Sequence, residues 1–230
     1  MLRTPEVSPL GDSAVLVSLG DVIDNAVYQD VTRLAQQCEQ HPFPGYVELV
    51  PAYSSLTIIY NPATIDFESV RAYVLDLWQQ PEDVSAIARE PVVIPVCYEG
   101  EFGPDLEYVA KYHGLTPSEV VELHTSGLYV VYMIGFTPGF PYLGGLSERL
   151  ATPRRSEPRV VVPAGSVGIA GQQTGIYSFD TPGGWQIIGR TPYRMFNPDA
   201  RPPTLLHPGQ QVRFQAITAE QYAALSSSTV

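Results

Sequence analysis

The sequence is poor in the residue types that most often carry phosphate, thiol or metal chemistry. Among its 230 residues are one lysine, two cysteines and four histidines. Since no lysine follows a glycine-rich loop, the GxxxxGK[ST] pattern of P-loop nucleotide binding is missing. The histidines show no HxH or HExxH spacing, so we expect no metal site. Without a CxxC pair, Cys38 and Cys97 are expected to be buried free thiols, with a disulfide or thiol mechanism as the alternative.

Long apolar runs are also missing. No stretch approaches the roughly 18 uninterrupted apolar residues of a membrane span, and the opening "MLRTPEVSPLGD" lacks the basic and apolar regions of a signal peptide. We therefore expect a cytoplasmic protein of one or two domains. The net charge of −11 argues against partners such as nucleic acid or an anionic membrane, since either favours a basic face.

The few basic residues are concentrated in one part of the chain. Residues 149–213 hold eight of the thirteen basic residues but three of the twenty-four acidic ones. Arginine pairs bidentately with carboxylates and phosphates, so this segment is suited to an anionic ligand. Pairing of these arginines with acids from elsewhere in the chain is the alternative.

The first ninety residues alternate short strands with two helices. Strands are expected at 14–19, paired with the preceding "RTPEVS", and in "GYVELVP" and "SLTIIY". Apolar residues at helical spacing predict one helix between these strands and a second that starts near Asp66. This order favours an α+β two-layer sandwich, residues 1–90. The hydrophobic period fades near residue 90, where we place the boundary to a second domain, residues 91–230.

Two helices are expected to follow, the first beginning at Pro104. In "TPSEVVELHTSG", Thr116 and Glu119 form a capping box, and Gly127 ends the helix. His124 then lies in the last turn, where unpaired carbonyls favour a protonated imidazole. Alternatively, His124 caps its own helix or packs against Tyr129.

From Leu128 onward, short strands are separated by glycine and proline. This pattern is typical of a small β-barrel or sandwich. Three of the connecting loops are unusual in composition: "GFTPGFPYLGGL", "AGQQTGIYSFDTPGGW" and "GRTPYRMF". Loops at the rim of such a fold often carry its site.

Several long stretches resemble one family. "VPAYSSLTIIYNP", "CYEGEFGPDLEYVA", "LHTSGLYVVYMIGFTPGFPYLGGL" and "PRVVVPAGSVGIAGQQTGIYSFDTPGGWQIIGRTP" are similar to the 5-oxoprolinase B subunit. This family includes an inhibitor of a sporulation histidine kinase and is related to allophanate hydrolase subunit 1. The resemblance implies a mainly-β cyclophilin-like barrel after the α+β domain. It also implies two partners, a carboxyltransferase-like C subunit of 5-oxoprolinase together with its A subunit.

With those partners, the family hydrolyses 5-oxo-L-proline to L-glutamate using ATP, which is bound by this chain or by a partner subunit. The alternatives are a regulatory inhibitor of a histidine kinase and a biotin-linked carboxyltransferase component acting on urea, allophanate or another amide. Lactam cleavage needs donors and cations for the developing charge. The expected catalytic residues are His124 for proton transfer, Arg190 for an anionic group, and Gln172. The expected substrate-binding residues are Gln173, Thr174, Tyr177, Phe140 and Tyr142.

Two further expectations concern the surroundings of these residues. Glu101 and Asp105 could orient His124, with solvated carboxylates at a helix start as the alternative. Tyr142 and Tyr177 line the pocket or, alternatively, belong to the barrel core. The loop "IGFTPGFPYLGGL" carries no charge, and we expect it to shape the pocket beside a partner interface.

Overall fold

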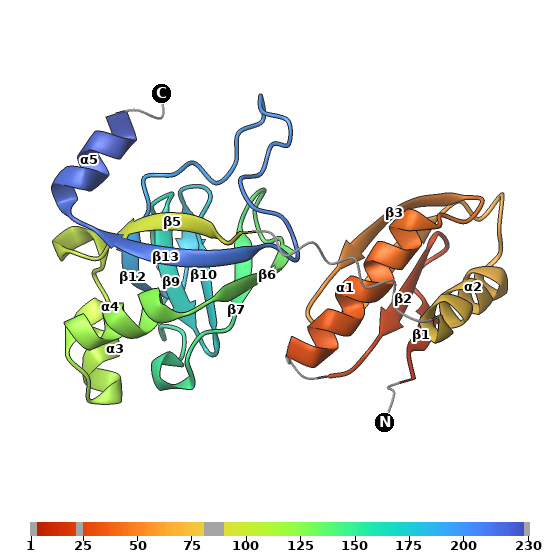
Figure 1. Cartoon of the computed structure of the whole chain (residues 1–230), viewed down its shortest axis with the longest axis horizontal. Coiled ribbons are helices and arrows are strands. Elements are labelled where there is room, and N and C mark those ends of the chain that lie inside the picture. Colours follow the sequence, from red (N-terminus) through yellow and green to blue (C-terminus); the bar gives the residue numbers. More distant parts are fainter. Residues whose placement is uncertain (1–3, 22–24, 81–89, 228–230) are drawn as a thin grey trace. The chain divides into compact units, whose positions relative to one another are not determined.

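The structure is a computed structural model that describes residues 4–21, 25–80 and 90–227. The chain divides into two compact units, residues 1–87 and 88–230 (Figure 1). The boundary expected near residue 90 adjoins residues 81–89, which lie outside the described residues. Within the described ranges, no helix is long and apolar enough to cross a membrane.

The first unit is built from one sheet and two helices. Its strands pair antiparallel in the order β1-β2-β4-β3. The strands are β1 (Glu6–Pro9), β2 (Ala14–Ser18), β3 (Tyr46–Pro51) and β4 (Ser55–Tyr60), and the helices are α1 (Asn25–Gln40) and α2 (Phe67–Gln79). The pairing of β1 with β2 confirms the hairpin expected at the start of the chain.

Alternation along the strands decides which face of this sheet is buried. Val17 pairs with Leu56 and Val15 with Ile58, and all four side chains are fully buried on one face. Both helices cover this face with apolar stripes: Val27, Val31, Leu34 and Cys38 from α1, and Val70, Val74 and Leu77 from α2. Cys38 and Cys97 are buried free thiols, as expected. Burial raises the pKa of the Cys38 thiol to about 12, so that it stays protonated.

The second unit is a closed seven-strand barrel with helices at its ends (Figure 1). Its strands are β5 (Val92–Cys97), β6 (Tyr129–Ile134), β7 (Pro141–Gly144), β9 (Ser166–Ala170), β10 (Gln173–Ile176), β12 (Gln186–Arg190) and β13 (Gln211–Ile217). The order around the barrel is β10-β7-β6-β13-β5-β12-β9. Of the two folds left open by the strand pattern, the barrel is therefore the observed one.

Smaller elements surround the barrel. Strands β8 (Arg159–Val162) and β11 (Thr181–Gly183) form a separate two-stranded ribbon. The helices are α3 (Leu106–His113), α4 (Pro117–Ser126) and α5 (Ala219–Ser227), with short 3-10 turns η1 (Gly100–Phe102) and η2 (Glu148–Leu150). In α4, Thr116 and Glu119 form the predicted capping box and Gly127 is the C-cap. Helix α3 begins at Leu106 rather than at Pro104, and the side chain of Asp105 makes no cap because it is used elsewhere.

Candidate functional site

His124, in the last turn of α4, is buried among the side chains of the barrel interior. Its ring stacks on Phe214 of β13 at 4.4 Å between centroids and lies 5.4 Å from the ring of Tyr129 in β6. Nδ1 is 2.8 Å from the Tyr98 hydroxyl, and Nε2 is 3.1 Å from Oγ1 of Thr174 in β10. The ring is 0% exposed. The packing against Tyr129 confirms the alternative that the sequence left open.

The hydrogen bonds fix the protonation state of this ring. Thr174 donates its hydroxyl proton to the Gly168 carbonyl at 2.9 Å, so its oxygen accepts from Nε2–H of His124. Nδ1 then carries no proton and accepts from the hydroxyl of Tyr98. Burial raises the pKa of this hydroxyl well above its usual value. Burial lowers the pKa of His124 to about 3. The expectation of a protonated imidazole at the helix end is therefore wrong, because loss of solvation outweighs the helix carbonyls.

A second group of predicted residues lies on the outer side of the barrel wall. Thr174 and Ile176 of β10 face the interior, so that Gln173, Gly175 and Tyr177 face outward. We define the outer aromatic cluster as Phe140, Tyr142, Tyr177 and Trp185. Ring centroids within it are 4.8 to 6.0 Å apart, in tilted and edge-on arrangements typical of aromatic packing.

Glycine makes room for this cluster on the wall. A Cβ at Gly175 would lie 3.0 Å from the ring of Phe140, and one at Gly168 would lie 3.1 Å from Cβ of Trp185. The ring of Phe140 and the Cβ of Trp185 therefore rest directly on strand backbone. Phe140 and Tyr177 are each 1% exposed, so neither side chain can meet a ligand from solvent in this structure. Tyr177 is thus buried, but in the outer aromatic cluster and not in the barrel core that the alternative named.

The remaining predicted residues can be reached from solvent. Gln172 is exposed in the turn between β9 and β10, and Gln173, Tyr142 and Arg190 are half-buried. The side-chain nitrogen of Gln173 is buried and has no hydrogen-bond partner among the described residues. Nε of Arg190 donates to the Ala164 carbonyl at 2.8 Å, and no ion pair involves Arg190 in the described part of the chain. Gln172 and Gln173 lie at the Ala170 end of β9, whereas Arg190 pairs with Ser166 at its other end, so these groups do not converge on one small ligand.

Asp105 does not contact His124, and it is not a solvated carboxylate either. It is 4% exposed and accepts hydrogen bonds from Arg155 at 3.1 Å and from Arg159 at 2.7 and 2.8 Å. The backbone N–H of Ile187 donates to the same carboxylate at 2.6 Å. Both sequence-based interpretations of Asp105 were therefore wrong. Its partners lie far along the chain, and the only available signal was the arginine-rich segment that follows η2.

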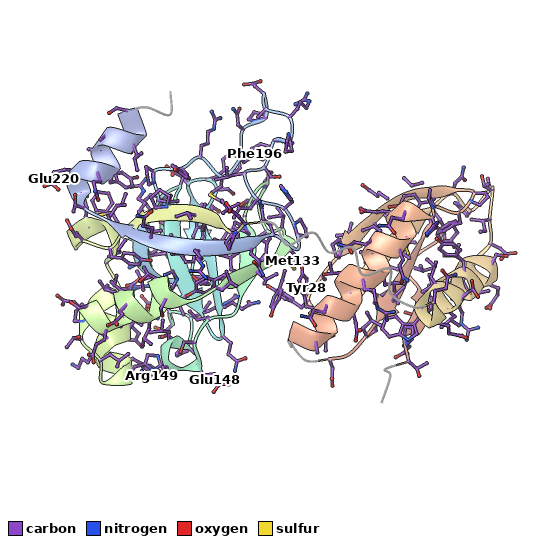
Figure 2. All side chains as sticks on the ribbon, in the orientation of Figure 1. Tyr28, Met133, Glu148, Arg149, Phe196 and Glu220 are labelled. Atoms are coloured by element: carbon purple, nitrogen blue, oxygen red, sulfur yellow. The ribbon has the colours of Figure 1, made fainter. Side chains whose placement is uncertain are left out.

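The three unusual loops meet at one end of the barrel. Oγ1 of Thr137 in the first loop is 2.9 Å from Oγ of Ser178 in the second. The backbone of Gly139 packs against Phe196 in the third, because a Cβ there would lie 2.8 Å from Cβ of Phe196. Phe179 and Phe196 have ring centroids 5.7 Å apart. Figure 2 labels Phe196 in the long segment that joins β12 to β13.

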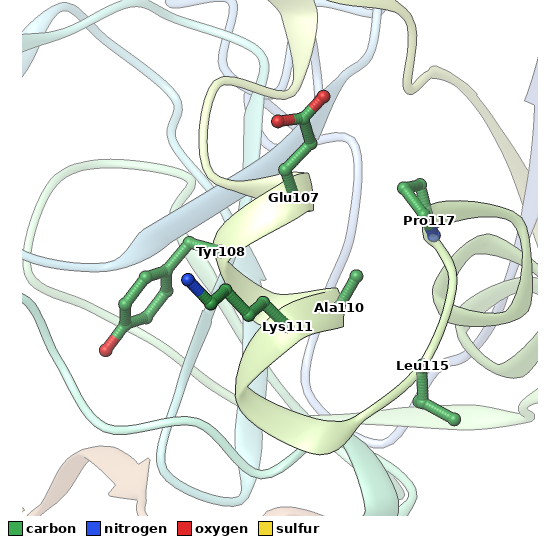
Figure 3. A pocket seen from close by; sticks show the side chains of 6 residues that line it. All are labelled: Glu107, Tyr108, Ala110, Lys111, Leu115 and Pro117. Carbon is green, nitrogen blue, oxygen red and sulfur yellow. The ribbon is translucent and has the colours of Figure 1, made fainter.

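A shallow hollow lies elsewhere, between α3 and α4 (Figure 3). It contains Lys111, the only lysine of the sequence, and none of the predicted site residues. Its lining residues are Glu107, Tyr108, Ala110, Lys111, Leu115 and Pro117. The described residues include no group of three or more His, Cys, Asp or Glu side chains that could hold a metal ion.

Comparison with known proteins gives the class of this barrel and its family. Residues 5–206 match the carboxyltransferase domain, subdomain C and D. The chain shares its fold with urea amidolyase of K. lactis. The TM-score is 0.76, with 21% identity, and the match covers 99% of this chain and 16% of the amidolyase chain. A conserved uncharacterized protein from Pyrococcus horikoshii is 49% identical over 94% of this chain and 100% of its own, with a TM-score of 0.58. The fold is thus that of a carboxyltransferase domain.

Within this class, relatives named as 5-oxoprolinase subunits are similar along nearly their whole length. The 5-oxoprolinase B subunit of Bacillus subtilis (strain 168) is 49% identical over 229 residues, which cover 95% of each chain. The chain belongs to the family of 5-oxoprolinase B subunits.

Proposed function

We propose that this chain is the B subunit of an ATP-dependent 5-oxoprolinase, which cleaves 5-oxo-L-proline to L-glutamate together with the A and C subunits. The observation that carries the proposal is the 49% identity to the 5-oxoprolinase B subunit of Bacillus subtilis across 95% of both chains. The name of that relative describes one member of an assembly. We expect the isolated chain to be inactive, with ATP bound by this chain or by a partner.

The reaction sets clear demands on the site. A lactam is a poor electrophile, and transfer of phosphate from ATP to its carbonyl oxygen activates the ring carbon for attack by water. The ring C–N bond then breaks as the nitrogen takes up a proton, and a second water hydrolyses the resulting acyl phosphate to L-glutamate and phosphate. Each step concentrates negative charge that fixed donors and cations can stabilise. Gln172, Gln173 and Tyr142, on or beside the paired strands β10 and β7, offer neutral donors, and Arg190 offers a cation at the other end of β9. We assign Arg190 to an anionic part of the substrate and the two glutamines to neutral donation.

His124 takes a different role in this proposal. A ring that is 0% exposed, with both nitrogens hydrogen-bonded, has no path for proton exchange with a bound substrate. We assign it to positioning: His124 holds Thr174, and Thr174 holds β10 to Gly168 of β9. Strand β10 then presents Gln173 on its opposite face.

The wider setting follows from the same family membership. We propose that the barrel unit, residues 91–230, has the cyclophilin-like fold, that residues 1–90 form a separate two-layer α+β domain, and that the protein works in the cytoplasm. Limited proteolysis near residue 90 tests the domain assignment. Two stable fragments are the expected result.

The decisive experiment is reconstitution of the activity. Purified A, B and C subunits are mixed with 5-oxo-L-proline and ATP, and L-glutamate and ADP are measured. Omission of this chain, of either partner or of ATP should abolish glutamate release. Robust association of the three proteins without turnover on 5-oxo-L-proline would contradict the proposal.

A second function is favoured by the match to the carboxyltransferase domain over residues 5–206. In that case the chain would act on urea, allophanate or another amide with a biotin-linked partner. Sensitivity of turnover to avidin separates the two functions. A 5-oxoprolinase is unaffected by avidin, whereas a biotin-linked carboxyltransferase is inhibited.

A further inference from the structure

Phe136 combines an unfavourable backbone with an exposed side chain. It lies in the turn between β6 and β7 with φ at +67°, and among the described residues no other non-glycine has a positive φ. Three backbone hydrogen bonds hold this turn. Gly135 N–H donates to the Phe140 carbonyl at 3.1 Å, Thr137 N–H to the Gly135 carbonyl at 2.8 Å, and Phe140 N–H to the Thr137 carbonyl at 3.1 Å. For a bulky residue this left-handed conformation is an outlier that costs conformational energy.

Burial does not offset this cost. The ring of Phe136 meets Phe140 and Tyr177 edge-on, with centroids 5.5 and 6.4 Å apart, yet it remains 60% exposed. Glycine at position 136 would adopt the turn without strain. The folding of this chain therefore gains little from a phenylalanine here, which suggests that the ring serves a contact outside the chain.

Other aromatic residues lie beside Phe136. The hydrogen bond between Thr137 and Ser178 brings the loop that carries Phe179 next to this turn. Phe179 is 40% exposed and packs against Phe196. We define the aromatic rim as Phe136, Phe179 and Phe196. These rings come from the three unusual loops, which the Thr137–Ser178 hydrogen bond and the packing of Gly139 against Phe196 bring together.

Arginines border the aromatic rim. Nε of Arg194 donates to the Phe196 carbonyl at 2.9 Å, and Arg190 donates to Ala164, whose N–H in turn binds Asp180 at 2.7 Å. Neither Arg190 nor Arg194 forms an ion pair within the described ranges. Exposed aromatic rings flanked by arginine are the residue types that dominate binding energy in protein interfaces. Their guanidinium groups match carboxylates on a partner.

We infer that the aromatic rim anchors a partner protein whose contact surface holds an apolar pocket bordered by Asp or Glu side chains. A second copy of this chain fits less well, because a two-fold contact would bring the same arginines together. This inference rests on the proposed function only in naming the partner, which we take to be the C subunit of the 5-oxoprolinase.

Replacement by glycine gives the sharpest test. Phe136→Gly removes the ring and also relieves the strained backbone. It should therefore weaken binding to the partner without destabilising the chain. Binding to the purified C subunit is measured by calorimetry, and unfolding of the isolated chain is followed by circular dichroism. We expect the dissociation constant to rise at least tenfold while the melting temperature stays the same or increases. Phe179→Ala should also weaken binding.

A matched control comes from another exposed aromatic side chain. Tyr108 of α3 is 50% exposed and lies outside the aromatic rim, so Tyr108→Ala should leave both measurements unchanged. Arg194→Glu should weaken binding, and raised salt should weaken the wild-type complex because exposed charge pairs are screened. Unchanged affinity of Phe136→Gly, or no binding of the wild-type chain to the C subunit, would overturn the inference.

Two further outcomes separate this inference from the proposed function. Turnover of 5-oxo-L-proline by a complex that tolerates Phe136→Gly would leave the function standing and remove the rim as an anchor. If Phe136→Gly disrupts the complex but the wild-type complex shows no turnover, the rim stands as an anchor and the proposed function falls. Light scattering of the chain alone is the last measurement. A homodimer that Phe136→Gly dissociates would show that the aromatic rim binds a second copy of this chain, and would overturn the choice of partner.

Discussion

Asp105 and Arg159 form a two-bond ion pair, with Oδ2 of Asp105 2.8 Å from Nη1 of Arg159 and Oδ1 2.7 Å from Nη2. The side chain of Asp105 is 5% exposed and that of Arg159 24%. The same carboxylate binds the backbone N–H of Ile187. One carboxylate thus joins the start of α3, strand β12 and the β8–β11 ribbon, whose Gly183 packs against the Tyr177 hydroxyl.

Loss of the Asp105 charge should destabilise the barrel unit. In Asp105→Asn the arginines keep their charge while their partner becomes neutral, and we expect the free energy of unfolding to fall by about 2–3 kcal/mol. Urea denaturation at neutral pH measures this change. The exposed pair of Arg71 and Glu68 serves as a control, because Glu68→Gln should cost less than about 0.5 kcal/mol. Equal effects of the two substitutions would show that the buried pair contributes no more than a surface pair.

Stability should depend on pH through His124. In the unfolded chain this histidine takes up a proton as the pH falls through about 6.5, whereas in the folded chain its pKa is lowered to about 3 by burial. The unfolded state therefore binds more protons between these values. We expect the contribution of His124 to stability to be present above pH 6.5 and to decrease by about 1.4 kcal/mol per pH unit between pH 6 and 4.

Two measurements check this pH dependence. The free energy of unfolding of the wild type should fall more steeply with decreasing pH than that of His124→Gln, since carboxylates contribute equally to both proteins. Where the variant does not fold, the ring resonances of the wild type serve instead. The His124 signals should not move between pH 8 and 5, with the exposed His41 and His207 as internal references. Titration of His124 near pH 6 would contradict its burial as a neutral ring.

Phe140 should behave as a core residue, despite its place in a glycine-rich loop. It is 1% exposed and contacts three aromatic rings in the outer aromatic cluster. We expect Phe140→Ala to lower the free energy of unfolding by about 3–5 kcal/mol, because it removes a large buried side chain and leaves a cavity. Thermal and urea unfolding of the isolated chain test this. A melting temperature unchanged from the wild type, with a specific loss of complex formation, would instead support a docking role for Phe140.

Local sequence patterns predicted much of the fold, but not which side of the barrel wall each candidate site residue faces. The capping box of Thr116 and Glu119 and the apolar alternation of β2 and β4 depend on residues close in sequence. By contrast, Gln173 and Thr174 are adjacent in one motif and face opposite sides of the barrel wall. Which side is interior depends on His124, fifty residues earlier in the chain.

The same limit applies to the charged residues. Asp105 was interpreted as orienting His124 or, alternatively, as a solvated carboxylate at a helix start, whereas its partners Arg155 and Arg159 lie 50 and 54 residues away. The concentration of arginine in residues 149–213 indicated an anionic partner. It could not distinguish a ligand from this buried carboxylate, which binds two of the eight arginines. The alternative of pairing within the chain is confirmed for these two, and an anionic ligand for the others stays a prediction.

Gln173 provides the most direct test of a substrate contact on the outer face. Its side-chain nitrogen is buried without a partner among the described residues, and a buried donor left unpaired is unfavourable. A substrate oxygen that accepts from it would remove this cost. In the reconstituted complex we expect Gln173→Glu, which replaces the donor at nearly constant shape, to lower kcat/KM for 5-oxo-L-proline at least about tenfold, the equivalent of one hydrogen bond of about 1.4 kcal/mol. Gln29→Ala, at an exposed position of α1, is the matched control and should leave kcat/KM unchanged. Circular dichroism of both variants establishes that each is folded, and a folded Gln173→Glu chain with wild-type kcat/KM would exclude Gln173 from substrate binding.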